Sequence, residues 1–145
     1  MEALDPKTLK SSLVENAVFT AWCYKCYDSD TIDVMYNIRE FVPCTADVFM
    51  KAKVRLARVD SPEMKSAVDV EKALATAGRD YLRSRILKKN ICLKTTKMDK
   101  YGRILADVFI DNVNINDELI AIGMVREYSG GKKTAWSINA DLTIN

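Results

Sequence analysis

The chain has 145 residues, of which 48% are hydrophobic and 29% charged, which favours one compact domain with its own core. No apolar run approaches the ~20 residues of a membrane helix, so we expect no membrane partner. The N-terminal stretch MEALDPKTLKSSLVENA has no basic segment followed by an apolar one. It therefore predicts no signal peptide and an intracellular protein. Histidine is absent, which excludes every mechanism that needs imidazole as a base, nucleophile or metal ligand.

The net charge of +2 conceals an uneven distribution of charge along the chain. Between residues 81 and 105 the only acidic residue is Asp99, so the local net charge is +7. The eight basic residues of this run are Arg83, Arg85, Lys88, Lys89, Lys94, Lys97, Lys100 and Arg103. Such a run favours a polyanionic partner, and a solvated helix face is the alternative that charge alone leaves open.

Alternating apolar residues predict five strands in chain order. We expect them over residues 17–27, 31–37, 53–60, 91–97 and 104–111. Residues 28–30 (DSD) are typical of a turn, so the first two strands should form a hairpin. Residues 37–52 are interpreted as a longer, less regular connection.

The pattern of apolar residues after the third strand predicts a helix. Val70, Leu74, Ala77 and Tyr81 recur at spacings of four, three and four, which indicates a helix over about residues 70–88. A second, short helix should follow the fifth strand.

Glycine and asparagine refine these two helices. Gly78 lowers the helix propensity in the middle of the first one. The second one should begin with Asn116 as its N-cap and end before Gly123.

The order of the elements predicts an α+β domain. Three strands, a helix, two strands and a helix fit a five-stranded OB-fold β-barrel. We expect an N-terminal lead-in over residues 1–16, the domain over residues 17–136 and a C-terminal tail over residues 137–145.

The four cysteines are interpreted as structural thiols. Cys23 and Cys26 form a CxxC pair, but no second CxxC or histidine pair completes a zinc tetrahedron. The pair lies in a predicted strand, where positions three apart face opposite ways. A thioredoxin-like redox motif would also need a turn and a helix start here. Cys44 and Cys92 complete the set, which fits an intracellular protein.

Four stretches carry candidate chemistry: DSDT (28–31), RLARVDSPE (55–63), DKYGR (99–103) and the basic run. Each has a simpler reading when taken alone. DSDT can be a hairpin turn, Arg55 and Asp60 can form a surface ion pair, and DKYGR can be a tight turn with a glycine at positive φ. Together they have the composition of a phosphodiesterase site.

The residue types explain that interpretation. Asp30 and Asp60 offer hard oxygen ligands for calcium or magnesium. Glu63 can hold or deprotonate a water. Arg55 and Arg103 present planar guanidinium groups that match phosphate oxygens. Because three carboxylates would repel a phosphodiester, charge balance requires a divalent cation beside the two arginines.

The sequence resembles a staphylococcal-nuclease-like (thermonuclease) domain from about Trp22 to Tyr128. DSDT resembles the family's D-G-D-T, RLARVDSPE resembles R-x-x-x-V-D-T-P-E, and DKYGR is unchanged. NDELIAIG, residues 116–123, resembles the helix N-x-x-L-[VI]-x-x-G. Four motifs in the same order are far more specific than any one of them. The resemblance implies an OB-fold barrel with about three helices and a calcium-dependent nuclease that leaves 3′-phosphates.

The resemblance also implies roles for individual residues. Asp30 and Asp60 would ligate one calcium ion together with the backbone carbonyl of Ser61, which replaces the family's threonine. The catalytic residues would be Arg55, Glu63 and Arg103, with Glu63 orienting the water and the arginines holding the scissile phosphate. The substrate-binding residues would be Lys100, Tyr101 and Tyr128.

Several features depart from the family pattern, including the lack of an evident long C-terminal helix. Ser29 replaces the turn glycine, so the shape of that turn is open. The connection over residues 37–52 is longer than usual and can alter the mouth of the site. Tyr128 is shifted by one position from the family's substrate-stacking tyrosine.

Two rival functions remain open at this point. The chain can be a catalytically weak member of the family that binds nucleic acid or protein, or a plain OB-fold single-strand binder that uses aromatic and basic residues. The complete set of carboxylates and arginines favours the enzyme. We expect a monomer that acts on DNA, RNA or both, with little sequence specificity. Single-stranded or fraying substrate is preferred, because a stacked base must unstack to meet Tyr101.

Overall fold

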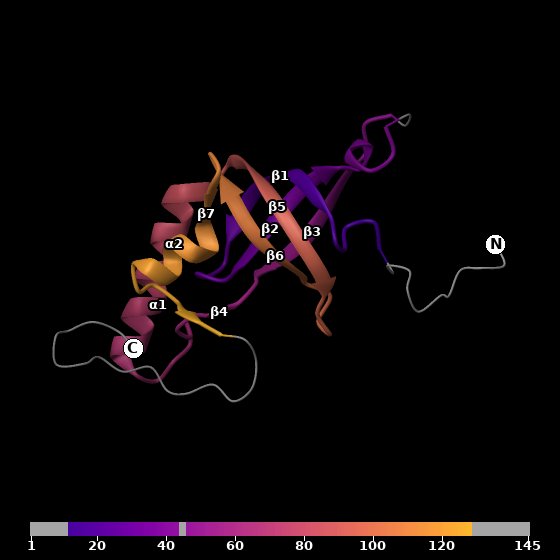
Figure 1. Ribbon diagram of the computed structural model, residues 1–145. Helices are drawn as coiled ribbons and strands as arrows, with labels where there is room; N and C mark the ends of the chain where they lie inside the picture. The colour runs from indigo at the N-terminus through magenta and orange to yellow at the C-terminus, as the bar shows by residue number, and fades with distance from the viewer. Residues whose placement is uncertain (1–11, 44–45, 129–145) are drawn as a thin grey trace.

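The computed structural model of the chain describes residues 12–43 and 46–128 (Figure 1). Its strands are β1 (Val18–Cys26), β2 (Thr31–Asn37), β3 (Phe49–Leu56), β4 (Val59–Asp60), β5 (Lys89–Met98), β6 (Ile104–Ile110), β7 (Val113–Asn114) and β8 (Arg126–Glu127). Its helical elements are the 3₁₀ turn η2 (Ile38–Glu40), α1 (Asp69–Ile86) and α2 (Ile115–Ala121). Most of the expected lead-in, the expected tail and Cys44 lie outside the described residues.

Five strands close into a barrel, as the sequence predicted. The main sheet runs in the order β3-β2-β1-β5-β6-β7, and a parallel pairing of β3 with β6 joins the two sides. Strand β6 alternates strictly between buried and half-buried residues, as expected for one face on a core. The α+β class and the OB-type barrel are therefore confirmed, with α1, α2 and η2 as the helical elements of the described residues.

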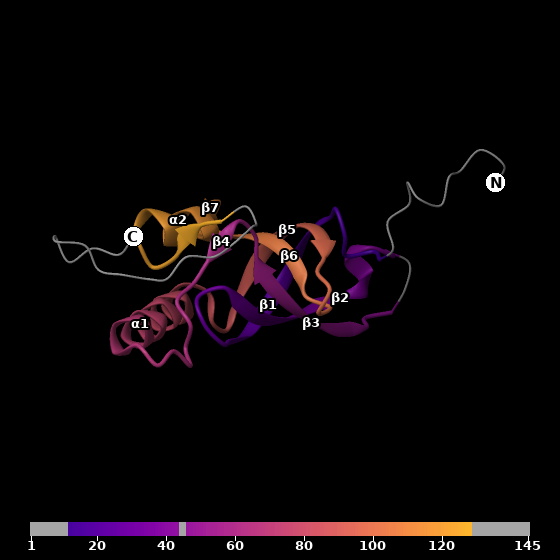
Figure 2. The same ribbon diagram turned by 90° about the horizontal axis from the view of Figure 1, so that it is seen from below.

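Helix α1 covers one end of the barrel, although not with the predicted side. Its buried residues are Ala75, Gly78, Leu82 and Ile86, at helical spacings of three and four. Val70 and Ala77 of the predicted apolar stripe are exposed instead. Figures 1 and 2 show α1 and α2 gathered at one end of the barrel, with η2 and the start of β3 at the opposite end. In the described part of the chain, no helix is long and apolar enough to cross a bilayer.

A β-bulge places both cysteines of the CxxC pair inside the barrel. Cys23 pairs with Val34, whereas Lys25 pairs with Asp33, so β1 carries one extra residue. Cys23 and Cys26 are both buried, and their Sγ atoms lie 3.8 Å apart. The expectation that they face opposite ways is therefore wrong. The hydrogen bond to Cys26 and burial raise the pKa of the Cys23 thiol.

The third predicted strand is two strands separated by a turn. β3 begins at Phe49, inside the segment expected to be an irregular connection, and ends at Leu56. The turn contains Arg58 with a φ of 67°, a conformation that a non-glycine residue adopts rarely. Strand β4 then pairs with β8, which the sequence did not predict.

The short helix α2 begins two residues earlier than predicted, and Asn116 has another role. The N-cap is Asn114, whose side chain accepts a hydrogen bond from the Asp117 N–H. Asn116 is fully buried, and its amide donates to the carbonyl of Ala57 and accepts from the N–H of Val108. Asn116 thus joins α2 to β6 and to the turn after β3.

Candidate active site

A cavity of about 550 Å³ forms where the β1–β2 turn, β3, the segment after β4 and the β5–β6 turn meet. The residues that line it are Asp28, Asp30, Thr31, Arg55, Ser61, Glu63, Lys100, Tyr101, Arg103 and Tyr128. Eight of the nine predicted site residues are in this set, and Asp60 is the exception. Three stretches that are far apart in the sequence therefore contribute to one cavity.

The DSDT turn holds Asp30 in a fixed position. The carboxylate of Asp28 accepts hydrogen bonds from the N–H groups of Asp30 and Thr31, at 3.1 and 2.9 Å. Asp30 in turn accepts from the hydroxyl of Thr31 at 2.9 Å and from that of Ser61 at 2.7 Å. Because Ser61 follows β4, this last bond joins the turn to the segment after β4.

Asp28 is a site residue that the sequence analysis did not select. Burial, a side-chain hydrogen bond with Asp30 and repulsion by Asp30 raise the pKa of Asp28 to about 7. Burial also acts to raise the pKa of Asp30, but the bond with Asp28, the charge of Arg55 and the two hydroxyls outweigh it and lower the pKa. The sequence feature that could have indicated Asp28 is the presence of two acidic residues two positions apart in one turn. Such a crowded carboxylate pair concentrates negative charge that a cation can balance.

The guanidinium group of Arg55 is held rigidly at the end of β3. It donates to the carbonyl oxygens of Leu56 at 2.6 Å and Val59 at 2.8 Å. Its Nη2 also lies 3.5 Å from Oδ2 of Asp30, and the Arg55 side chain is only 12% exposed. Arg55 therefore carries a positive charge on the wall of the cavity, in an orientation that the backbone decides.

The DKYGR turn positions Arg103 through Asp99. The Asp99 carboxylate accepts from the N–H groups of Tyr101 at 2.8 Å and Arg103 at 3.0 Å, and from Nε of Arg103 at 2.7 Å. Gly102 has a φ of +79°, which the turn requires. The Tyr101 ring is 70% exposed, and its centroid lies 5.3 Å from Cζ of Arg103. Sequence reasoning missed this positioning role of Asp99, although the residue stands in the quoted motif.

Asp60 is not among the residues that line the cavity, and its carboxylate forms an ion pair with Arg126. The Nε and Nη2 atoms of Arg126 both lie 2.9 Å from Oδ2 of Asp60, and the two residues are opposite each other in the β4–β8 ladder. Only 4% of the Asp60 side chain is exposed. The structure therefore brings Asp30 and Ser61 to the cavity and pairs Asp60 with a residue that the sequence analysis did not consider.

The donor set of the cavity fits a hard divalent cation in its chemistry. Asp28, Asp30, Ser61 and Thr31 place carboxylate and hydroxyl oxygens on one wall, which are the ligands that calcium and magnesium prefer. Across residues 12–43 and 46–128, no group of three or more acidic or cysteine side chains forms a ready-made cation site. A cation at this wall would therefore rely on hydroxyl, carbonyl or substrate oxygens as well as on carboxylates.

A second cavity of about 570 Å³ adjoins the first. Arg55, Arg103 and Tyr128 line both cavities, and Leu56 and Leu105 give the second one apolar walls. The N–H of Tyr128 donates to the Arg58 carbonyl at 2.8 Å, which places this residue at the border of the two cavities. A bound polymer can therefore contact both.

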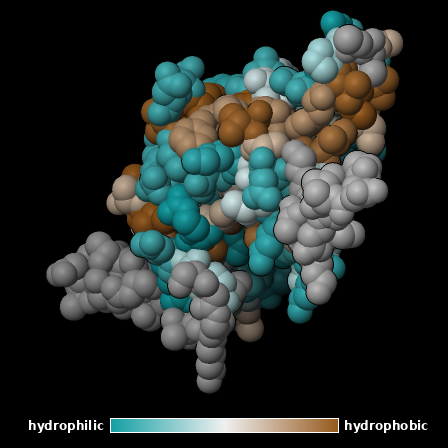
Figure 3. Space-filling view, turned by 45° about the vertical axis from the view of Figure 1, so that its right-hand side comes forward, coloured by the Kyte–Doolittle hydropathy of each residue, from teal (hydrophilic) through white to brown (hydrophobic). Residues whose placement is uncertain are grey.

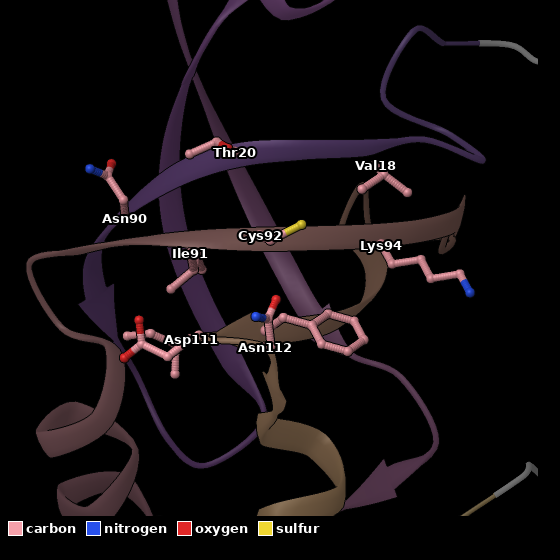
Figure 4. A pocket seen from close by; sticks show the side chains of 10 residues that line it. Val18, Thr20, Asn90, Ile91, Cys92, Lys94, Asp111 and Asn112 are labelled. Atoms are coloured by element: carbon pink, nitrogen blue, oxygen red, sulfur yellow. The ribbon is translucent and has the colours of Figure 1, made fainter.

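A third cavity, of about 520 Å³, lies on the outside of β1, β5 and β6 (Figure 4). Its charged lining residues are Lys94 and Asp111, and it contains none of the predicted site residues. Its residue types provide neither a carboxylate pair nor an arginine for phosphate chemistry.

The basic run is only partly available to a polyanion. Arg83 donates to the carbonyl of Cys26 at 3.1 Å, and Arg85 forms an ion pair with Glu118 at 2.7 Å. These two arginines fasten α1 to the rest of the fold. The lysines of β5, by contrast, are exposed. The run is therefore divided between structural contacts and a basic strand.

Comparison with known proteins identifies relatives of this chain. A family model described as staphylococcal nuclease homologue matches residues 53–140. An uncharacterized endonuclease of Haemophilus influenzae is 38% identical over 76 residues, which cover 52% of this chain and 39% of that protein. An uncharacterized endonuclease of Escherichia coli is 28% identical over 102 residues, which cover 70% of this chain and 56% of that protein. The chain thus spans between about two fifths and just over half the length of these relatives.

The matched region begins inside β3 and includes Arg55, Glu63 and Arg103. The DSDT turn precedes the matched region in the sequence, and the fold of the barrel brings this turn to the cavity. Because the family model matches more than half of the chain and the barrel is the one that the motifs predicted, the chain belongs to the staphylococcal nuclease family.

Proposed function

We propose that this chain is a calcium-dependent nuclease that hydrolyses phosphodiester bonds of DNA, RNA or both, with little sequence specificity. The observation that carries the proposal is that Arg55 and Arg103 line the same cavity as the carboxylates of Asp28, Asp30 and Glu63. The name endonuclease, which both relatives bear, supports the same reaction class.

The proposed reaction is a displacement at phosphorus. Water attacks the phosphorus and loses a proton to Glu63, and the bond between phosphorus and the 5′-oxygen breaks. The departing oxygen takes up a proton from solvent, so the products are a 5′-hydroxyl and a 3′-phosphate. Arg55 and Arg103 stabilise the negative charge that develops on the phosphoryl oxygens, because guanidinium groups match those oxygens in shape and charge.

Glu63 has the freedom that this role requires. Its side chain is exposed at the edge of the cavity, directly after the buried Pro62, whereas Asp30 is buried and bonded on both carboxylate oxygens. An exposed carboxylate beside the cavity can approach a water, and a buried, bonded one can hold a cation. The two kinds of carboxylate therefore suit two different tasks.

Asp30 and the carbonyl of Ser61 are the proposed cation ligands, together with Asp60 as the resemblance implies. When bound, calcium would polarise a phosphoryl oxygen and offset the carboxylate charge. Asp60 can take part once its oxygens are shared between the cation and Arg126. Asp28 would support Asp30 through the turn that it closes.

Chelation and end-group analysis test the proposal. Cleavage of labelled oligonucleotides should cease in excess chelator and return with calcium, and Glu63→Gln should be strongly impaired. The new 5′ ends should accept phosphate from a polynucleotide kinase without prior dephosphorylation. Undiminished cleavage in chelator, or 5′-phosphate products, would refute the proposal. Binding without any cleavage would favour the rival, a catalytically weak module.

The preferred form of the substrate and the oligomeric state are further parts of the proposal. Tyr101 is highly exposed beside Arg103, so a loose base can stack on it, whereas a base in a duplex must first unstack. We propose a monomer that cleaves single-stranded or fraying A·T-rich substrate faster than G·C-rich duplex. Initial rates on matched single-stranded and duplex oligonucleotides measure this preference, and sedimentation measures the mass.

A further inference from the structure

A basic and aromatic surface runs from the candidate site along the outside of β3. Residues 49, 51, 53 and 55 lie on one face of this strand, because side chains alternate between faces. In the β2–β3 ladder they pair with Asn37, Met35, Asp33 and Thr31. We call the surface formed by Lys25, Tyr27, Phe49, Lys51 and Lys53 the β3 face.

The half of the β3 face closest to the site is organised around Tyr27. The Nζ atoms of Lys25 and Lys53 lie 4.1 and 4.3 Å from the centroid of its ring. Lys53 also donates to the Tyr27 hydroxyl at 3.1 Å. This bond, with one from Lys25, lowers the pKa of Tyr27. Two cations thus contact one aromatic ring, beside the strand that carries Arg55.

The far half of the β3 face carries an unusual exposed ring. Phe49 is 67% exposed and Lys51 lies next to it on the same face. At about 3.4 Å per residue, the distance along the strand from Arg55 to Phe49 is roughly 20 Å. Figure 3 shows hydrophobic surface gathered at this end of the molecule, over η2 and the start of β3. The strand that carries the β3 face therefore leads to Arg55 of the site and is long enough for several nucleotides.

We infer that the β3 face binds the part of a single-stranded nucleic acid that extends beyond the active-site cavity. Bases would stack on Phe49 and Tyr27, while Lys25, Lys51 and Lys53 would contact phosphates, the combination that single-strand binders use. The inference rests on the proposed function for its ligand class, and it adds a second binding region more than one nucleotide away from the scissile bond.

Charge favours a nucleic acid over a protein at this surface. Asp33 is the acidic partner within the ladder, and its carboxylate already lies 3.3 Å from Nζ of Lys53. Asp47, in the connection before β3, is paired with Arg39 at 3.1 Å. The lysines therefore leave a net positive surface around the two rings. A hydrophobic protein partner would not need lysines between its contacts.

The test compares a short ligand with a long one. Fluorescence anisotropy in chelator measures binding of labelled oligothymidylates, one a trinucleotide and one of about 12 residues. Phe49→Leu keeps the apolar bulk but removes the ring, and Lys51→Ala removes one charge. Lys72→Ala is the matched control, because Lys72 is exposed on α1, away from the β3 face.

Wild-type protein should bind the longer oligonucleotide more tightly than the trinucleotide. Phe49→Leu and Lys51→Ala should each weaken binding of the longer one by about 5- to 30-fold and so reduce the difference between the two lengths. Lys51→Ala should also lower the salt slope of log K by about 0.7. The control should match wild type.

The possible failures can be told apart. Length-dependent binding that these variants weaken, without cleavage under any cation, would support the β3 face and refute the proposed nuclease. Cleavage with wild-type affinity in both variants would refute the β3 face and leave the nuclease intact. Loss of a dimer in Phe49→Leu, with unchanged oligonucleotide binding, would show that the surface joins two copies of the chain and would overturn the inference.

Discussion

The two arginines of the candidate site are held in place in different ways. Arg103 belongs to the β5–β6 turn, where Asp99 accepts three hydrogen bonds from residues no more than four positions away. Arg55 also has local contacts, to the carbonyl oxygens of Leu56 and Val59, but its ion-pair partner Asp30 is fixed by Ser61, 31 residues along the chain. The arrangement around Arg103 can form from five residues, whereas the pairing of Arg55 with Asp30 exists only when the barrel is closed. A local motif therefore supports one side of the site, and long-range packing supports the other.

Removing each arginine tests this difference most strongly. Arg103→Ala and Arg55→Ala should both reduce kcat by ~10²–10⁵, because each removes a fixed donor to the developing charge. Their stabilities should differ. Arg55→Ala leaves the buried Asp30 carboxylate without its guanidinium partner. This substitution should lower the free energy of unfolding by about 3 kcal/mol. Arg103→Ala should stay within about 1 kcal/mol of wild type.

Kinetics and urea unfolding on the same preparations provide the measurement. Arg55→Lys is the companion variant, since it keeps the positive charge and loses the planar guanidinium. It should recover most of the stability and little of the turnover. Equal destabilisation by the two alanine variants would contradict the division into a local and a long-range half.

Packing under the β1–β2 turn should respond to Gly78. A Cβ at Gly78 would lie 3.0 Å from Cβ and 3.1 Å from Oγ of Ser29, which is fully buried. In an exposed helix, Gly→Ala stabilises by about 1 kcal/mol. Here we expect Gly78→Ala to destabilise by about 1–3 kcal/mol and to reduce activity, because overpacking displaces the turn that holds Asp30.

The double variant Gly78→Ala/Ser29→Gly provides the control. It removes the clash together with the Ser29 hydroxyl, which has no hydrogen-bond partner among the described residues. It should therefore restore stability, and a double-mutant cycle in thermal or urea unfolding measures the coupling. Additive effects of the two substitutions on the free energy of unfolding would show that there is no steric clash between the helix and the turn.

The local half of the site should tolerate change better. Asp99→Asn keeps an acceptor for the two N–H groups but loses the charge opposite Nε of Arg103. We expect kcat to fall by about tenfold with little change in KM, because Arg103 is held less firmly in the transition state. Asp99→Ala should lower kcat further. A fall in stability of several kcal/mol in Asp99→Asn would show that the turn also supports the barrel.

The smallest effect should come from the contact between α1 and α2. The hydrogen bond and charge of Arg85 lower the pKa of Glu118 below its usual range, and the two groups lie 2.7 Å apart. A lowered folded-state pKa stabilises the fold above the unfolded value of about 4.3, and that contribution disappears as the pH falls through the folded-state value. Glu118→Gln should cost less than about 1 kcal/mol at pH 7. The difference from wild type should vanish under acid conditions in urea unfolding. A difference that grows as the pH falls would contradict this account.

Local chemistry in the sequence was sufficient for much of the fold and for half of the site. Strand alternation predicted β1, β2, β5 and β6 to within about two residues, because burial on one face of a strand repeats every second residue. DKYGR indicated its own turn, because the hydrogen-bond donors, the acceptor and the glycine that form the turn are close together in the chain. The ordered motifs also indicated the family that the comparison confirmed.

Only the tertiary structure decided which distant groups meet. The ion pair between Asp60 and Arg126 arises from the ladder of β4 and β8, and the buried side of α1 follows from where the helix lands on the barrel. The bulge in β1 turns both cysteines inward, and Asn116 caps no helix because its amide binds β6 and the turn after β3 instead. These outcomes depend on the free energies of contacts between residues far apart in the chain, and no local period or motif records them.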